Sequence, residues 1–501
     1  MSSLSHLEEK IRAGWLGKVI GGTLGGPFEG YAGKLNVPFY DPIPSQALPN
    51  DDLDLQVVWL RYLLSKKVTS VQPADLADAW QKHVGFPWCE YAVGLRNRHY
   101  GLSGVQLGAF DNWFADCMGA AIRSEIWAFL APSDTRRAAH YAWADAIFDH
   151  AGDGVYAAMF FAVLESSAFE DSDLNSLIEK GLAAIPAASR TAFAVRRTQY
   201  LWSLIRNWEE VREILIVDLA PTHFTDTAIN IAFTILGLLA GERDFERTLC
   251  IANNCGWDTD CTAATAGAIL GVMDPSCIPP KWSDPIGGKV LLNPQILDMP
   301  LETSLDELTE QTLQLRAQLT HHIVGDTIVL PRMRPRPSES PIQIPYRCGI
   351  QEQSIKSVTT LTDIPAESFT AAGHWFRHSV SDPKAKAMHF SFNVKIDDER
   401  PVRFMAFLSR PCRTFVDGKS YADFEPRSWA PGWHGPSFHL FAERAVDGTK
   451  PLRAPALVLT PGEHRFDVLL EHDGTDAIEL VIGVADATSD LWLPFALAIA
   501  K

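Results

Sequence analysis

A proline-rich stretch divides the chain into two parts with different sequence patterns. Residues 330–346 read LPRMRPRPSESPIQIPY. Proline removes a backbone donor and breaks helices, so this stretch predicts a linker over residues 331–346. A chain of 501 residues is also too long for one ordinary hydrophobic core. We therefore predict one domain over residues 1–330 and a second domain over residues 347–501.

The two parts differ in their hydrophobic periodicity. Before the linker, apolar residues recur at three- and four-residue spacing, for example in residues 75–84, 136–150 and 245–254. After it, β-rich or alternating runs are separated by turn residues, and they occupy residues 388–396, 402–409, 464–472 and 477–485. The pattern predicts an all-α domain followed by a smaller β-sandwich of the jelly-roll kind.

The charge and the apolar runs exclude several classes of partner. The net charge of -17 disfavours nucleic acid, whose backbone is neutralised by Lys and Arg, and it disfavours an anionic membrane surface. A small anionic substrate remains possible because a bound metal can reverse the local field. No apolar run reaches the roughly 20 residues that cross a bilayer. The oligomeric state stays open.

The termini and the cysteines predict a cytoplasmic protein. The N-terminal residues 1–22 lack a basic region followed by an apolar block, so we expect no secretory signal. The eight cysteines are scattered and form no CxxC pair. In a chain of this length, such cysteines are expected to be reduced and mostly buried.

The first acidic motif is Asn50-Asp51-Asp52, which precedes the apolar helical run of residues 55–64. One interpretation is a helix N-cap with acids in the first turn, which stabilises a helix by about 1 kcal/mol. Three consecutive side chains with oxygen ligands are more than a cap needs. The motif is therefore also a candidate metal site.

The second acidic motif is Gly256-Trp257-Asp258-Thr259-Asp260, which ends a loop and opens another helix. Asp258 and Asp260 are two residues apart and would not share a face inside a helix. At a helix start, one side chain can come from the loop and the other from the first turn. Capping is again the alternative, although one cap needs only one oxygen.

The two motifs together favour a metal centre. They lie about two hundred residues apart at the starts of two helices, where they could face one another. Carboxylate and amide oxygens are ligands for Mg²⁺, Mn²⁺ or Ca²⁺, whereas zinc more often takes His or Cys. Two cations roughly 3.5–4 Å apart could activate a water and polarise a substrate hydroxyl.

A third motif is the glycine-rich segment of residues 14–29, GWLGKVIGGTLGGPFE. Its glycines at 14, 17, 21 and 25 fall on one helical stripe. Glycine in a helix costs about 1 kcal/mol relative to Ala, so we expect another helix to approach closely. The segment is not a P-loop, because GK[ST] is absent, and no strand precedes it. Glu29 follows it in what we expect to be a mobile loop, as a site residue or a solvated acid.

These three motifs, in this order, resemble the ADP-ribosylglycohydrolase family over about residues 11–274. The resemblance implies an orthogonal all-α domain with a binuclear magnesium centre in a cleft. It assigns metal binding to Asn50, Asp51, Asp52, Asp258 and Asp260. The family's glutamate after the glycine-rich helix falls on Glu29.

Three departures from the family pattern bear on specificity. Cys261 stands where many members have Thr or Ser, and a thiol is a poor Mg²⁺ ligand. The family's Gly-Asp pair in the first helix is Gly21-Gly22 here. Its Gly-Asn-Gly substrate loop matches Cys117-Met118-Gly119, so the Asn amide is lost.

Other residues are weaker candidates for the cleft. His150 and Asp153 lie where the family lines its cleft, although a lone His is more often a core residue. The rings of Trp113, Trp127 and Trp257 could stack on a base or sugar, or pack in the core. Asp111 and Asp116 flank the substrate loop. Our candidate substrate contacts are Asp116, Met118, Gly119, His150 and Trp257.

The resemblance and the ligand chemistry together predict a hydrolase of a glycosidic bond at an ADP-ribose-like sugar. Two Mg²⁺ ions would bind the ribose hydroxyls and a water, and Asp52 or Glu29 would transfer a proton. The substrate would be a small molecule or an ADP-ribosylated one. One alternative is a related metal-dependent hydrolase of a nucleoside or small sugar conjugate. Another is a non-enzymatic relative of the crystallin kind.

The β-rich part carries a tryptophan cluster that predicts a recognition loop. Residues 427–434 read RSWAPGWH, and Trp429 and Trp433 could stack on a ligand ring. The alternatives are that both tryptophans pin the loop to the sandwich core, or that this domain only dimerises the protein.

Overall fold

The fold is described from a computed structural model. It describes residues 3–86, 89–99, 101–110, 112, 114–221, 223–320, 328, 342–349, 355–361, 367–371, 375–379, 386–408, 411–424, 455–471 and 477–487. Trp429 and Trp433 lie outside these residues, as do Asp111 and Trp113. The recognition loop therefore stays a prediction.

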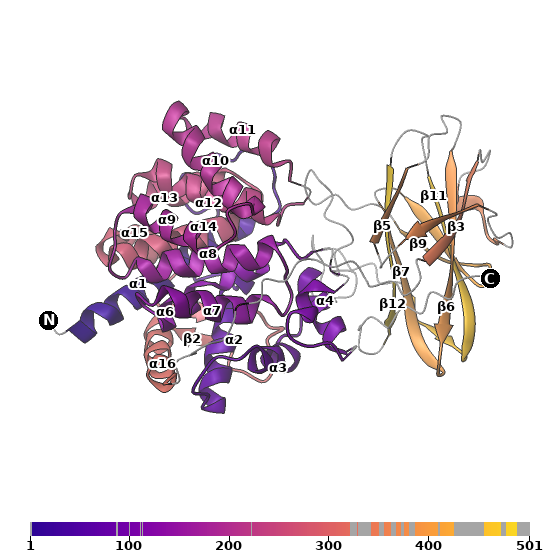
Figure 1. Ribbon diagram of the computed structural model, residues 1–501, viewed down its shortest axis with the longest axis horizontal. Helices are drawn as coiled ribbons and strands as arrows, with labels where there is room; N and C mark the ends of the chain where they lie inside the picture. The colour runs from indigo at the N-terminus through magenta and orange to yellow at the C-terminus, as the bar shows by residue number, and fades with distance from the viewer. Residues whose placement is uncertain are drawn as a thin grey trace.

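The described chain is helical up to residue 318 and forms antiparallel sheets from residue 342 (Figure 1). The prediction of a helical part followed by a β part is confirmed. None of the described helices is both long enough and apolar enough to span a membrane. The α-helices are α1 (Ser3–Gly25), α2 (Asp51–Lys66), α3 (Pro73–His83), α4 (Cys89–His99), α5 (Gln106–Ala109), α6 (Glu125–Leu130), α7 (Thr135–Ala146), α8 (Asp153–Ser167), α9 (Leu174–Ala183), α10 (Arg190–Ile205), α11 (Trp208–Leu219), α12 (Thr227–Gly241), α13 (Phe245–Asn254), α14 (Thr259–Met273), α15 (Pro280–Ser283) and α16 (Leu305–Gln318).

Short helical turns and one small ladder complete the helical part. The 3-10 turns are η1 (Gly26–Phe28), η2 (Met118–Arg123) and η3 (Pro275–Cys277), with η4 (Ile355–Ser357) in the β part. Strands β1 (Lys289–Leu291) and β2 (Glu302–Ser304) pair antiparallel within the helical part. This ladder was not expected from the sequence, because three residues are too few to establish an alternating pattern.

Helices α1 and α14 pack closely along the glycine stripe, and this packing positions the second acidic motif. An added Cβ at Gly17 would lie 2.1 Å from the carbonyl oxygen of Gly267, and one at Gly21 would lie 2.2 Å from that of Ala263. One at Gly25 would lie 2.3 Å from the amide nitrogen of Asp260. The predicted close approach at the glycine stripe is therefore confirmed. It sets the end of α1 directly against the start of α14.

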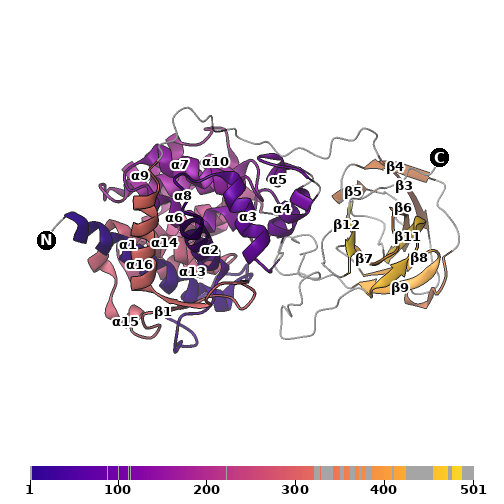
Figure 2. The same cartoon turned by 90° about the horizontal axis from the view of Figure 1, so that it is seen from below.

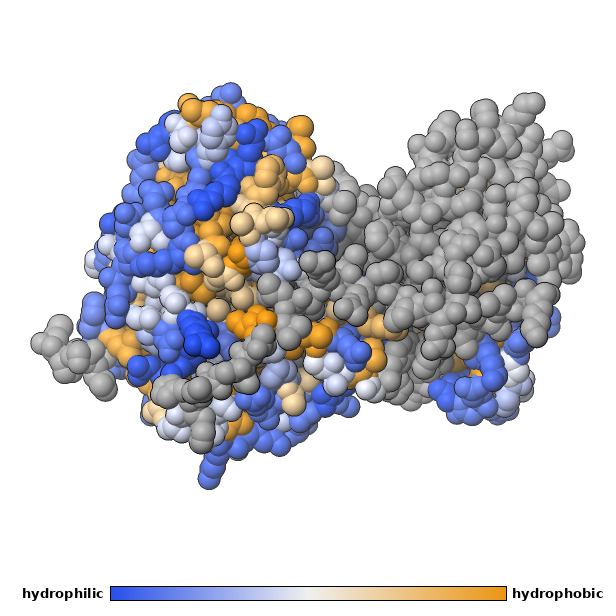
Figure 3. Space-filling view, viewed as in Figure 1, coloured by the Kyte–Doolittle hydropathy of each residue, from blue (hydrophilic) through white to orange (hydrophobic). Residues whose placement is uncertain are grey.

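The surface of the helical part is mainly hydrophilic on the face shown in Figure 3, with apolar atoms scattered between. Its core contains large side chains that are fully buried, including Trp15, Trp59, Trp80 and Trp127. Trp127 donates from Nε1 to Asp145 at 3.0 Å and is 0 % exposed. Its ring therefore packs in the core, which was one of the two predicted roles.

The β part consists of two antiparallel sheets, seen facing each other in Figure 2. Their strand orders are β10-β7-β12-β5 and β4-β3-β6-β11-β8-β9. The rings of Phe404 in one sheet and Phe466 in the other stack with centroids 4.7 Å apart. The strands are β3 (Ile342–Gly349), β4 (Glu367–Ala371), β5 (Trp375–Ser379), β6 (Ala387–Ile396), β7 (Arg400–Leu408), β8 (Cys412–Val416), β9 (Lys419–Phe424), β10 (Leu457–Leu459), β11 (Gly462–Glu471) and β12 (Ala477–Asp486).

Strand β3 corrects the end of the predicted linker. Residues 342–346 were assigned to the linker because of their prolines, but they pair with β4. Pairing of β3 with β6 begins only at Tyr346, after Pro345. Because Pro345 comes before the first residue that pairs with β6, its missing N–H removes no hydrogen bond between β3 and β6. The strand therefore tolerates the proline.

Candidate metal centre

Asn50 caps helix α2 and links the two acidic motifs. Its backbone is extended (φ -153°, ψ 130°), and its Oδ1 accepts from the amide of Asp52 at 2.7 Å. Its Nδ2 donates to Oδ2 of Asp260 at 3.0 Å. The capping interpretation therefore holds for Asn50, whose amide nitrogen faces the second motif. In this arrangement Asn50 orients Asp260, and its Oδ1 is engaged by the amide of Asp52.

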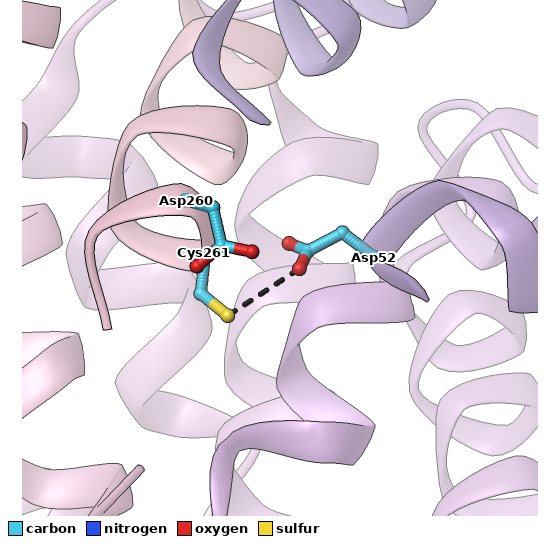
Figure 4. Close-up of side chains that lie close together, drawn as sticks. All are labelled: Asp52, Asp260 and Cys261. Carbon is cyan, nitrogen blue, oxygen red and sulfur yellow. Dashed lines mark hydrogen bonds between the residues drawn. The ribbon is translucent and has the colours of Figure 1, made fainter. Parts of the chain in front are cut away.

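Carboxylates from both motifs converge on two sets of ligand atoms. Asp52, Asp260 and Cys261 place one ligand atom each within 4.8 Å of the others (Figure 4). Glu29, Asp258 and Asp260 do the same. Asp260 belongs to both sets, so the sets are adjacent. The starts of α2 and α14 thus meet as two neighbouring candidate cation sites.

The electrostatics of these acids fit a cation. Burial raises the pKa of Asp258 well above its ordinary value, and the nearby Asp260 and Glu29 carboxylates raise it further. Burial also raises the pKa of Asp52. The nearby Asp260 and Asp51 carboxylates raise it further, whereas Lys18 lowers it. Within the described chain, Oδ1 of Asp260 is buried and accepts no hydrogen bond. Crowded oxygen ligands with an unsatisfied oxygen are what a hard divalent cation binds.

Cys261 occupies one corner of the first set. Its Sγ donates to Oδ2 of Asp52 at 3.4 Å, as Figure 4 shows. Burial raises the pKa of this thiol well above its ordinary value, and the surrounding carboxylates raise it further. A protonated thiol is a poor ligand for Mg²⁺. This set therefore has fewer effective ligands than the set of Glu29, Asp258 and Asp260.

Lys18 is a site residue that was not expected from the sequence. Its ammonium is buried on α1 and donates to Asp52 Oδ1 and Glu125 Oε1 at 2.9 Å each, and to the carbonyl of Ile122 at 2.6 Å. Burial lowers its pKa, but the two carboxylates outweigh that effect and raise it. Lys18 therefore stays charged and fixes one oxygen of Asp52. A charged residue within an otherwise apolar glycine stripe was the signal available in the sequence.

Asp51 and Asp54 have other partners. The half-buried Asp51 accepts from the Tyr91 hydroxyl at 3.1 Å and lies outside both ligand sets. Asp51 nevertheless raises the pKa of Asp52, so it lies close to the centre. Asp54 is fully buried and accepts from the amide of Asn293 at 3.2 Å, which gives it a structural role.

The loop that carries Glu29 is fixed to the second motif. Gly30 donates to the carbonyl of Trp257 at 2.8 Å, and Trp257 donates to the carbonyl of Tyr31 at 2.7 Å. Gly256 has a φ of 74°, and a Cβ there would lie 2.3 Å from the carbonyl oxygen of Gly33. These contacts tie the backbone of this loop to the second acidic motif. The Glu29 side chain itself is exposed.

The predicted substrate residues fall into two groups. Met118 and Trp257 are 1 % and 3 % exposed and pack in hydrophobic clusters, so both side chains form part of the core. Pattern alone could not reveal this burial. Asp116 is half-buried, with Arg190 at 3.9 Å and His223 at 3.8 Å. His223 and Arg190 lower the pKa of Asp116 against the effect of burial, so basic neighbours within the protein already stabilise its negative charge.

Two further candidates from the sequence lie away from the ligand sets. Asp153 accepts from the amide and hydroxyl of Thr191 at 2.7 and 2.8 Å, so it ties α8 to α10. His150 is fully buried and contacts Asp149 through Nδ1 at 2.7 Å. A third candidate, Gly119, is the second residue of the turn η2.

Comparisons with known proteins agree with the resemblance seen in the sequence. The model of the ADP-ribosylglycohydrolase family matches residues 3–319. A solved structure described as an "ADP-ribosylglycohydrolase-related protein complex" is 18% identical, with a TM-score of 0.44, over 63% of this chain and 99% of that chain. No curated protein matches the chain. The family match ends before β3, so it covers the helical part.

Proposed function

The chain belongs to the ADP-ribosylglycohydrolase family, and from this premise we propose that it is a metal-dependent hydrolase of an N- or O-glycosidic bond at an ADP-ribose-like sugar. Glycohydrolase activity is what the family description states. The observation that carries the metal-dependent part is the position of Asp260. Its carboxylate belongs to two adjacent ligand sets and keeps a buried oxygen without a hydrogen bond among the described residues.

Two Mg²⁺ ions, or Mn²⁺ or Ca²⁺ in their place, are the proposed cofactors. Asp52 and Asp260 would hold one of them, and Glu29, Asp258 and Asp260 the other, with Asp51 nearby. When bound, such ions supply positive charge that polarises sugar hydroxyls and makes water more acidic. Oxygen ligands in this number favour these ions over zinc.

The chain's own residues divide the remaining work. Both oxygens of Asp52 are engaged, one by Lys18 at 2.9 Å and the other by Cys261 at 3.4 Å. Asp52 is therefore suited to hold a fixed position and not to move a proton. Glu29 is exposed and sits beside Asp258 and Asp260. Of the two carboxylates that we predicted to be catalytic, Glu29 is the one placed to exchange a proton with solvent or substrate.

The bond type and the leaving group are the open part of this proposal. The Asn amide of the family's substrate loop is replaced here by Met118, which is buried. This loss favours a second candidate function, the hydrolysis of another N- or O-glycoside such as a nucleoside or a small sugar conjugate. Both candidates use the same ligand sets.

Two measurements test the proposal. Isothermal titration with MgCl₂ after EDTA treatment should show binding, and Asp260→Asn should abolish it. Chromatography should show product release from ADP-ribosyl-arginine peptides, or from a nucleoside panel, only when Mg²⁺ is present. Mg²⁺ binding without hydrolysis of any glycoside would favour a non-enzymatic protein. Hydrolysis that survives EDTA would contradict the metal assignment.

A further inference from the structure

A line of buried charged side chains runs behind the substrate loop and ends at Glu90 of α4. The Arg123 guanidinium donates to both oxygens of Asp149, at 3.1 and 2.7 Å. Asp149 contacts Nδ1 of His150 at 2.7 Å. On the other side of the ring, Nε2 of His150 lies 3.6 Å from Oε1 of Glu90. The side chains therefore alternate in charge from guanidinium to carboxylate, imidazole and carboxylate.

The last contact of this line is too long for a hydrogen bond. His150 is 0 % exposed, and no described residue hydrogen-bonds to its Nε2. Burial lowers the pKa of His150, but Asp149 and Glu90 outweigh that effect and raise it to about 9. The ring therefore carries a proton on Nε2 at neutral pH, and that proton faces Glu90. The separation leaves Glu90 attracted to the ring but still able to accept another donor.

Glu90 also lies between the substrate loop and the metal centre. A Cβ added at Gly119 would lie 2.2 Å from Oε1 of Glu90, so the missing side chain at Gly119 makes room for this carboxylate. The neighbouring Tyr91 donates its hydroxyl to Asp51 at 3.1 Å. Burial is the largest cause that raises the pKa of the Cys89 thiol. The carboxylates of Glu90, Asp51 and Glu29 raise it further, so all three lie near this thiol.

We propose that Glu90 contacts the substrate, accepting a hydrogen bond from a hydroxyl or N–H donor of the glycoside, with the line from Arg123 through His150 holding it in place. This proposal rests on the proposed function, because it assumes a glycoside bound beside the metal centre. It supplies a polar contact from α4, beside the loop whose Asn is lost at Met118. Arg123, Asp149 and His150 are positioning residues in this scheme.

Glu90→Gln is the direct test, because it removes the charge and keeps the volume. We expect an affinity for ADP-ribose, or a KM for the glycoside, that is weaker by about 10- to 100-fold, as for loss of a hydrogen bond to a charged group. Mg²⁺ affinity measured by calorimetry should stay within about twofold, since Glu90 is in neither ligand set. If Glu90→Gln fails to fold, Glu90→Asp keeps the charge beside His150 and withdraws the carboxylate by one methylene.

Glu165→Gln is a matched control. Glu165 is fully buried on α8 and lies in neither ligand set, and burial raises its pKa well above its ordinary value, so removing its charge should cost little. We expect it to bind ADP-ribose and Mg²⁺ as the wild type does. This control separates loss of a buried carboxyl from loss of the Glu90 contact.

The two probes distinguish where the donor lies. Weaker binding of ADP-ribose by Glu90→Gln places the donor on the ribose hydroxyls or the adenine amino group, whereas a raised KM alone places it on the leaving group. An active wild type with an unchanged, folded Glu90→Gln variant overturns the assignment of Glu90 only. A wild type that binds no ADP-ribose and hydrolyses no glycoside overturns the proposed function and this inference together.

Discussion

Two buried groups of acids in the helical part differ in how their charge is balanced. In the line that ends at Glu90, the Arg123 guanidinium is buried among Asp145 and Asp149, and it contacts both. Arg123 and His150 outweigh burial and lower the pKa of Asp149. At the starts of α2 and α14, by contrast, burial and neighbouring carboxylates raise the pKa of Asp52 and Asp258.

The difference separates a structural charge network from a ligand site. An acid whose pKa is lowered by a base has its charge compensated within the protein. An acid whose pKa is raised by other acids is costly to ionise, and a bound cation would remove that cost. Lys18 partly compensates Asp52, but it shares its ammonium with Glu125. The metal centre is therefore the region where the chain leaves charge for a ligand to neutralise.

The largest effect is expected from breaking the compensated network with Arg123→Met. This change leaves Asp145 and Asp149 buried without their counter-ion, which typically costs about 3–5 kcal/mol. Urea unfolding followed by circular dichroism measures the loss. Arg197→Met is the control, because Arg197 pairs with Asp218 at the surface and should cost about 0–1 kcal/mol. Equal losses of unfolding free energy in the two variants would mean that the buried network stabilises the fold no more than a surface ion pair does.

In contrast to Arg123→Met, Asp258→Asn should reduce activity without reducing stability. It removes a ligand charge without removing volume, so we expect hydrolysis to fall by more than about 100-fold, beyond the loss seen for residues that only orient ligands. The metal-free fold should be as stable as the wild type or more stable, because repulsion with Asp260 and Glu29 is relieved. Asp51→Asn should weaken Mg²⁺ binding and activity less than Asp258→Asn does, because Asp51 lies beside the two ligand sets and in neither of them. An Asp258→Asn variant with wild-type turnover in Mg²⁺ would show that the centre is misplaced.

Each acidic motif could be placed at a helix start from the sequence, because capping depends on neighbouring residues. Two such starts with carboxylates suggested that the motifs face one another. The close pair α1 and α14 could be predicted because a stripe of glycines along a helix is costly unless another helix packs against it. Lys18 could not, because its partners Asp52 and Glu125 are 34 and 107 positions away. The burial of Met118 and Trp257 depends on tertiary packing, which no short pattern encodes. Glu90 was missed because its partner His150 comes from a different segment of the chain.

Stability against pH should also separate the two groups. Asp52 and Asp258 have raised pKa values in the fold, so their protonated forms favour folding. Their contribution is present below the ordinary Asp pKa of about 3.9 and is lost as pH rises through the raised values. His150, raised from 6.5 to about 9, contributes stability below pH 6.5 that is lost as pH rises through 9.

Thermal unfolding from pH 5 to 9.5, in EDTA and in MgCl₂, measures both contributions. We expect Mg²⁺ to raise Tm by a few degrees, with an increment that grows as the carboxylates ionise. The loss attributed to His150 should persist in Mg²⁺ and disappear in His150→Asn. A Tm that is unchanged by Mg²⁺ at every pH would remove the distinction between the two groups.

The smallest effect is expected from removing the β part. Both groups of acids lie before residue 320, and the described contacts of Lys18, Asp260 and Arg123 are with residues of the helical part. We propose that residues 1–330 form a domain of their own, since the proline-rich stretch that follows is typical of a boundary. The truncated chain should keep its helical circular dichroism and bind Mg²⁺ with an affinity within about twofold of the full chain. If the truncated chain is soluble and folded but binds no Mg²⁺, the β part contributes to the centre. If it is insoluble while the full chain is sound, the boundary is wrong.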